Sequence, residues 1–106
     1  MKKYAMMLLN PLFRPQEHFA LFTTENIENH ILTVRNAREA LEKTEELVLH
    51  GFGVLELCGA FGKENADKLI EATGGRAAIG YVHYEPEQKK KVEAYFADFG
   101  LAPQDE

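Results

Sequence analysis

The chain has 106 residues, of which 45% are hydrophobic and 27% charged, and its formal net charge at pH 7 is −5. This size allows a single domain with a sizeable core, and the composition excludes a disordered chain. The acidic balance argues against nucleic acid and anionic membranes as partners, because both attract clusters of Lys and Arg. The one basic run, residues 89–91, lies between acids and is interpreted as the solvated face of a helix. No apolar stretch has the length that spans a bilayer.

The first residues imitate a secretory signal, because a basic start at Lys2 and Lys3 precedes an apolar run. That run is cut short by Asn10 and Pro11, and no small-residue cleavage site follows it, so a buried strand explains it better. The single cysteine, Cys58, cannot form an internal disulfide, and nothing therefore indicates secretion. The expected location is the cytoplasm.

The first quarter of the chain predicts one strand and one short helix. Residues 4–9 are nearly all apolar, which is typical of a strand covered on both faces. Pro15 can occupy the first position of a helix that runs to Phe22. The polar residues 23–29 are expected to form a loop.

The second unit contains the clearest helix signals. Residues 31–34 predict a strand, and Asn36 with Glu39 three residues later has the spacing of a helix cap and its partner. Apolar residues then recur at helical spacing until Gly51, which can close the helix in a left-handed conformation.

The second half repeats the pattern twice. A strand over residues 54–58 and a glycine-containing turn precede a helix over 63–73, whose inner face is expected to hold Ala66, Leu69 and Ile70. Gly74 and Gly75 stop that helix. A fourth strand is predicted over residues 77–83, and Pro86 opens a last helix. The inner stripe of this helix is predicted to be Val92, Tyr95 or Phe96, and Phe99.

This alternation predicts the α/β class: one small domain of four βα units with a mainly parallel four-stranded sheet. The pattern leaves open whether the sheet is doubly wound or curls like half of a barrel. The domain is expected to cover residues 1–100, with residues 101–106 as a loose tail. Because a small sheet leaves two edges exposed, a homo-oligomer is expected.

Parallel sheets bind ligands beyond the carboxyl ends of their strands, so a site is expected there. The turn after the third predicted strand contains two glycines and leads into a helix N-terminus, which can hold a phosphate or a carboxylate. The same glycines can also serve only to turn the chain. The residues expected to bind a small anionic ligand at this end are Asn10, Arg35, Gly59, Phe61, Gly62 and Tyr84. Arg35 can instead form a surface pair with Glu39.

Three residues are candidates for catalysis. Glu56 and Cys58 are two apart in a strand and so share a face, and His83 ends the next predicted strand. A thiol, an imidazole and a carboxylate together can form an activated nucleophile or an acid–base pair. Each has a structural alternative: an exposed Glu, a small core Cys and a hydrogen-bonded His. The remaining histidines show no metal-ligand spacing, and no metal or cofactor is expected.

The segment Glu56-Leu57-Cys58-Gly59-Ala60-Phe61-Gly62 resembles the turn of a family of short, uncharacterised prokaryotic α/β proteins. The stretch Pro15-Gln16-Glu17-His18 is similar to another part of that family, although the charged last helix is longer here. The resemblance implies that Glu56, Cys58, Gly59 and Gly62 act together, and it implies no catalytic role.

Three functions are thus compatible with the sequence. The leading hypothesis is a module that binds a small anionic ligand at the carboxyl ends of the strands. The second is a small enzyme that uses Cys58 or Glu56 with His83. The third is a structural or assembly subunit without a small-molecule site, which requires Glu56 to face solvent.

Overall fold

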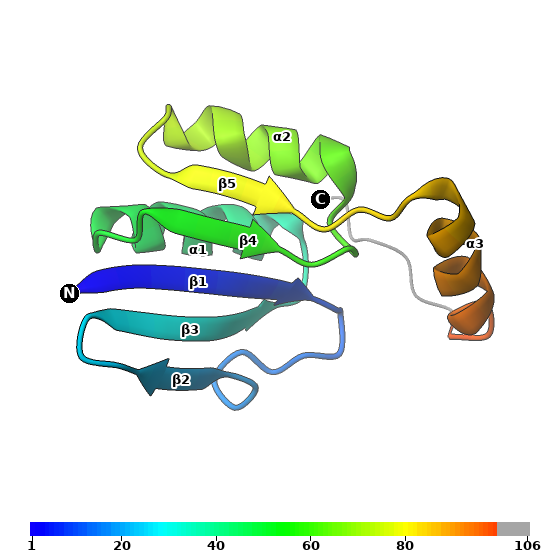
Figure 1. Ribbon diagram of the computed structural model, residues 1–106, viewed down its shortest axis with the longest axis horizontal. Coiled ribbons are helices and arrows are strands. Elements are labelled where there is room, and N and C mark those ends of the chain that lie inside the picture. The colour runs from blue at the N-terminus through cyan, green and yellow to red at the C-terminus, as the bar shows by residue number, and fades with distance from the viewer. Residues whose placement is uncertain (100–106) are drawn as a thin grey trace.

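Five strands form one sheet in the order β2-β3-β1-β4-β5 in the computed structural model, which describes residues 1–99 (Figure 1). Strand β1 pairs in parallel with both β3 and β4, β4 pairs in parallel with β5, and β2 runs antiparallel to β3. The strands are β1 (Lys2–Leu9), β2 (Ala20–Thr23), β3 (Ile27–Val34), β4 (Val54–Leu57) and β5 (Ala78–Tyr81). The helices are α1 (Ala37–Leu49), α2 (Gly62–Thr73) and α3 (Pro86–Tyr95).

The expected four-stranded sheet of four βα units is wrong, because the described chain has a mixed five-stranded sheet and three helices. The error lies between β1 and β3, where the helix predicted from Pro15 to Phe22 is replaced by turns and by β2. The hydroxyl of Thr33 donates to the carbonyl of His18 at 2.7 Å, which fixes the incoming chain beside β3. Strand β3 therefore begins at Ile27, within the stretch expected to be a loop.

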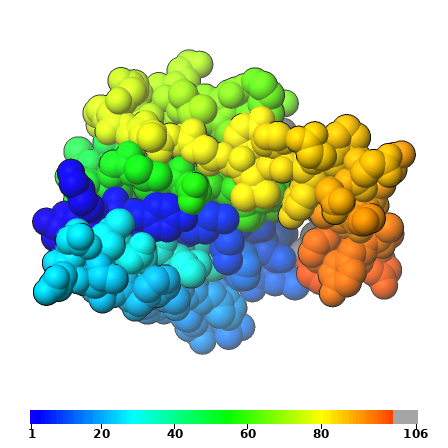
Figure 2. Space-filling view, in the orientation of Figure 1, coloured from blue at the N-terminus to red at the C-terminus, as the bar shows by residue number. Residues whose placement is uncertain are grey.

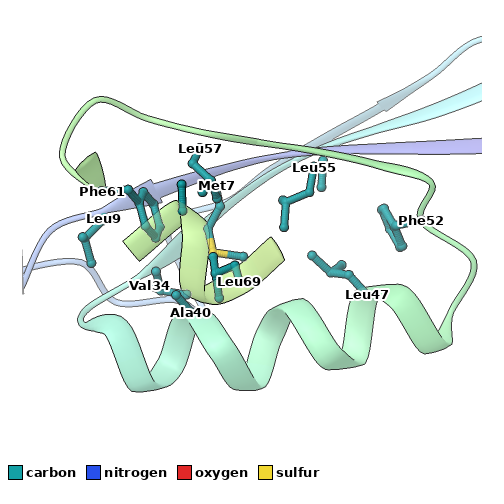
Figure 3. Close-up of a cluster of buried hydrophobic side chains, with 12 residues drawn as sticks. Met7, Leu9, Val34, Ala40, Leu47, Phe52, Leu55, Leu57, Phe61 and Leu69 are labelled. Atoms are coloured by element: carbon teal, nitrogen blue, oxygen red, sulfur yellow. The ribbon is translucent and has the colours of Figure 1, made fainter. Parts of the chain in front are cut away.

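The core lies between one face of the sheet and two helices. Ala5, Met7 and Leu9 alternate along β1 and all belong to the buried core. Met7 and Leu9 lie on the side of β1 that faces α1 and α2 (Figure 3). Arg76 beyond α2 forms an ion pair with Glu45 of α1 at 3.4 Å, which joins the two helices near their C-terminal ends. The buried core consists of Ala5, Met7, Leu9, Val34, Ala40, Leu47, Phe52, Leu55, Leu57, Phe61, Ala66 and Leu69.

The cap signals predicted for α1 and α2 are confirmed, except that Glu39 is not the reciprocal partner of Asn36. The side chain of Asn36 accepts a hydrogen bond from the backbone N–H of Glu39 at 2.9 Å. The carboxylate of Glu39 accepts from the backbone N–H of Arg35 rather than from the cap residue. Gly74 closes α2 with a left-handed φ of 58°, a conformation that glycine adopts without a Cβ clash.

The other face of the sheet has no helix over it within residues 1–99 (Figures 1 and 2). The interpretation of β1 as a strand covered on both faces is therefore wrong. Pairing and alternation assign these residues to what we call the open sheet face: Lys2, Tyr4, Met6, Leu8, Ala20, Phe22, Ile27, Asn29, Ile31, Thr33, Val54, Glu56, Ala78 and Gly80. Thr33, whose hydroxyl donates to His18, is the one that is buried. Among the others, Val54 is 42% exposed and Phe22 58% exposed.

Helix α3 extends beyond the carboxyl ends of the strands (Figure 1), and none of its residues is buried. The prediction that it turns an inner stripe toward the core is wrong, since Tyr95, Phe96 and Phe99 are exposed. Ile70 of α2, also predicted to be inside, is exposed as well. The proposed loose tail, residues 101–106, lies outside the described residues. None of the helices in the described part of the chain is long and apolar enough to cross a membrane.

Candidate functional site

The carboxyl ends of β1, β3, β4 and β5 lie at one rim of the sheet, because these four strands run parallel. Backbone hydrogen bonds continue past the strands and hold the ends side by side. The N–H of Asn10 donates to Val34, that of Cys58 to Met7, and that of Val82 to Leu57. The predicted site segments are therefore neighbours, as the site hypothesis requires.

The turn between β4 and α2 is held by the N–H of Phe61, which donates to the carbonyl of Cys58 at 3.1 Å. Gly62 has a φ of +72°, so a side chain there would be strained. A Cβ on Gly59 would lie 3.3 Å from the ring of Tyr84, which shows that this ring lies against the turn. The first turn of α2 has no side-chain cap. Phe61 itself is buried in the core.

Two of the predicted anion-binding residues have partners within the protein. The side chain of Asn10 accepts from the N–H of Leu12 at 2.8 Å and so shapes the turn after β1. Arg35 forms an ion pair with Glu39, which is the alternative interpretation of that residue. Hydrogen bonding from the Arg35 guanidinium lowers the pKa of the Glu39 carboxyl.

The three catalytic candidates are not joined by any hydrogen bond in the described part of the chain. The sulfur of Cys58 accepts from the N–H of Leu9 at 3.3 Å, and its side chain packs at the margin of the core. The ring of His83 lies 5.7 Å from that of Tyr81, centroid to centroid. Glu56 is exposed on the open sheet face. The nucleophile and acid–base hypotheses stay predictions.

The partner of Glu56 is Tyr4 on the neighbouring strand, whose hydroxyl donates to the carboxylate. The register places Tyr4 opposite Val54 and Met6 opposite Glu56, so the two polar side chains are diagonal neighbours on the open sheet face. The hydrogen bond, together with partial burial and the negative charge of Glu56, raises the pKa of Tyr4 to about 12.

We expect one of the four tyrosines to titrate last, near pH 12, because deprotonation of Tyr4 would break its bond to a carboxylate. The folded pKa lies above the usual value of 10.0. The stability that the hydrogen bond between Tyr4 and Glu56 contributes is therefore fully present below pH 10.0 and is lost as the pH rises toward 12. Tyrosinate absorbance measures the titration, and circular dichroism at each pH separates it from alkaline unfolding. Glu56→Gln should lower the last pKa, and Tyr4→Phe should abolish that step. Persistence of the step in Tyr4→Phe would assign it to another tyrosine.

A groove of about 450 Å³ lies between α1 and α2, on the side of the molecule opposite the open sheet face. Its apolar wall includes Leu41 and Phe61. Asn65 also lines it and is 8% exposed. The amide nitrogen of Asn65 donates to the carbonyl of Phe61 at 2.9 Å, whereas its side-chain oxygen accepts no hydrogen bond. The full lining is Ala37, Arg38, Ala40, Leu41, Phe61, Asn65, Lys68, Leu69, Glu71 and Ala72.

Sequence reasoning missed Arg38, Lys68 and Asn65 as a group. Their spacing contains no motif, and they come together only because α1 and α2 lie side by side. A weak signal was present, since Asn65 occupies a buried helix position where an apolar residue would be expected.

A second cleft, of about 440 Å³, lies between residues 13–17 and α1. Six of its seven charged lining residues form ion pairs: Arg14 with Glu17, Arg35 with Glu39, and Lys43 with Glu46. Residues 1–99 contain no group of three or more His, Cys, Asp and Glu side chains placed to hold a metal ion.

Comparison with known proteins places the chain in one family. Residues 2–97 match the family model described as a family of unknown function, DUF6506. No curated protein and no solved structure gives a significant match. Because the match covers nearly the whole chain, this protein belongs to the DUF6506 family, whose function is unknown.

Proposed function

We propose that this protein binds a small anionic ligand with an apolar body in the groove between α1 and α2. The observation that carries the proposal is the lining of this groove, which combines an apolar wall with Asn65, whose buried amide oxygen accepts no hydrogen bond from the described residues. A ligand that donates an N–H or O–H to Asn65 would satisfy that oxygen, and an unsatisfied buried polar group is costly. A volume of about 450 Å³ is within the range of small-molecule sites.

The charge of the lining favours an anion. The charged lining residues are Arg38, Lys68 and Glu71, a formal excess of one positive charge in a chain whose formal net charge is −5. Lys68 also lies 3.8 Å from Glu64, outside the lining. Both helices follow parallel strands, and their N-termini therefore lie near the carboxyl rim with the positive ends of their dipoles. A carboxylate or phosphate near Arg38 would gain from both effects.

The proposal is tested by a thermal-shift screen of small carboxylates and organic phosphates against the full-length chain. A ligand at one hundred times its Kd stabilises the folded state by about 2.7 kcal/mol, which raises the Tm of a domain of this size by about 10 °C. Isothermal titration should then confirm one-to-one binding, and amide chemical shifts should change along the facing sides of α1 and α2.

The double variant Arg38→Gln with Lys68→Gln should weaken binding of the best compound by about ten-fold or more, because it removes charge-assisted contacts. Lys63→Gln is the matched control, since Lys63 is an α2 cation that does not line the groove and pairs with Asp67. The proposal fails if no compound stabilises the protein, or if the double variant and the control bind equally well.

A further inference from the structure

We propose that two copies of this chain form a symmetric dimer in which α3 of each copy covers the open sheet face of the other. Neither surface is covered by another element within residues 1–99 of one chain. Val54 and Phe22 expose much of their area on the sheet, and α3 buries none of its residues. Figure 2 shows the strand side chains uncovered, with α3 extending from one end of the molecule. A two-fold axis between two copies would cover both surfaces in one interface.

Helix α3 has an apolar side that suits such a surface. Val92 and Phe96 are four residues apart and so lie on one side of the helix. The ring of Phe96 contacts those of Tyr95 and Phe99, with centroids 5.1 and 5.3 Å apart. Exposed aromatic clusters of this kind are typical of interface anchors. Without a partner, they would leave a large apolar area in water.

One charged residue on each surface can pair across the interface. Glu56 lies on β4, within the open sheet face, among mostly apolar neighbours. Lys89 lies three residues before Val92 and therefore on the same side of α3. Lys90 pairs with Glu87 at 3.3 Å, whereas Lys89 forms no ion pair with any residue of the described chain. The sheet face also carries Lys2 at the start of β1, and Glu93 lies four residues after Lys89. Docking of the apolar side of α3 would allow Lys89 of one copy to pair with Glu56 of the other.

The length of α3 matches the width of the sheet. The ten residues of α3 give a helix about 15 Å long at 1.5 Å per residue. Four adjacent strands spaced about 4.8 Å apart span a similar width. A single copy of α3 can therefore cross β3, β1, β4 and β5.

The connection after β5 favours the partner's sheet over the helix's own. Val82 continues the ladder by donating to Leu57 at 2.9 Å, and the ring of Tyr84 lies against Gly59 at the rim. Glu85 is extended, with φ −59° and ψ 152°. The chain therefore leaves the rim in the strand direction (Figure 1), and would have to reverse to lie over its own open sheet face.

Sedimentation velocity of the full-length chain over a range of concentrations tests the proposal. The wild type should be dimeric. Phe96→Glu should raise the dissociation constant of the dimer by about thirty-fold or more, as loss of a central interface anchor does. Leu49→Glu is the matched control, because Leu49 is 76% exposed at the end of α1 and away from both surfaces. It should leave the dimer intact.

A charge exchange tests the arrangement itself. Glu56→Lys alone should weaken the dimer by about ten-fold or more, and adding Lys89→Glu should restore most of the affinity. Circular dichroism confirms that each variant is folded. The proposal is overturned by a monomeric wild type, including one whose α3 amides are protected from hydrogen exchange by docking on their own sheet. A dimer that Phe96→Glu leaves intact, or that Leu49→Glu weakens equally, also overturns it.

Discussion

Replacement of Phe61 by alanine is expected to lower the free energy of unfolding by about 3–5 kcal/mol, a large part of the 5–15 kcal/mol typical of a domain. Phe61 is 2% exposed and is among the largest fully buried side chains in the described chain. It lies at the start of α2, where the turn after β4 enters the core (Figure 3). Its removal would leave a cavity beneath a turn that Gly62 already constrains, so little collapse can compensate for the loss.

Urea denaturation followed by circular dichroism measures this change, and an unchanged m-value would show that the same surface is exposed on unfolding. Phe19→Ala is the matched control. Phe19 is 60% exposed before β2, and its loss should change the free energy of unfolding by about 0.5 kcal/mol or less. Similar small effects at both positions would contradict the assignment of Phe61 to the core.

The parts of the fold that the sequence predicts correctly are those with local signals. Asn36 caps α1 through the N–H three residues later, and this geometry depends only on adjacent backbone. The same holds for Gly74 at the end of α2 and for Pro86 at the start of α3. Such signals locate helix ends regardless of what packs around them.

Strand β2 lacked a signal because it is a four-residue edge strand with every side chain exposed. Without a buried side there is no alternation of apolar and polar residues to read. The first half of β3 was missed for a related reason, because it contains polar residues. The side chains of Glu28 and His30 form a hydrogen bond of 3.0 Å with each other. Strand pairing of these residues depends on neighbours that are distant in sequence.

The sequence predicted which segments lie together, but not the groove. Parallel pairing of β1, β3, β4 and β5 gathers the predicted segments at the carboxyl rim of the sheet, and their role in binding stays a prediction. However, Asn10 and Arg35 are occupied by local partners. The groove depends on how closely α1 approaches α2, which is decided by packing of side chains such as Ala40 and Leu69.

Met6 and Met7 provide the sharpest test of the one-sided architecture, because these adjacent residues of β1 point to opposite faces. Met7 is fully buried under the helices, whereas Met6 is partly exposed on the open sheet face. Met7→Lys is expected to destabilise the fold by more than about 4 kcal/mol, since the ammonium group would be buried without a partner. Met6→Lys should cost about 1 kcal/mol or less, because its long side chain can reach water.

Urea denaturation of both variants, at a concentration below that of any self-association, gives the two free energies. If both substitutions unfold the chain, the second face is covered within the monomer, and the open sheet face does not exist as described. If Met6→Lys remains folded but loses the dimer that the wild type forms, the same face is both dispensable for folding and required for assembly. That outcome would explain why β1 is apolar on both sides when only one side is buried by its own helices.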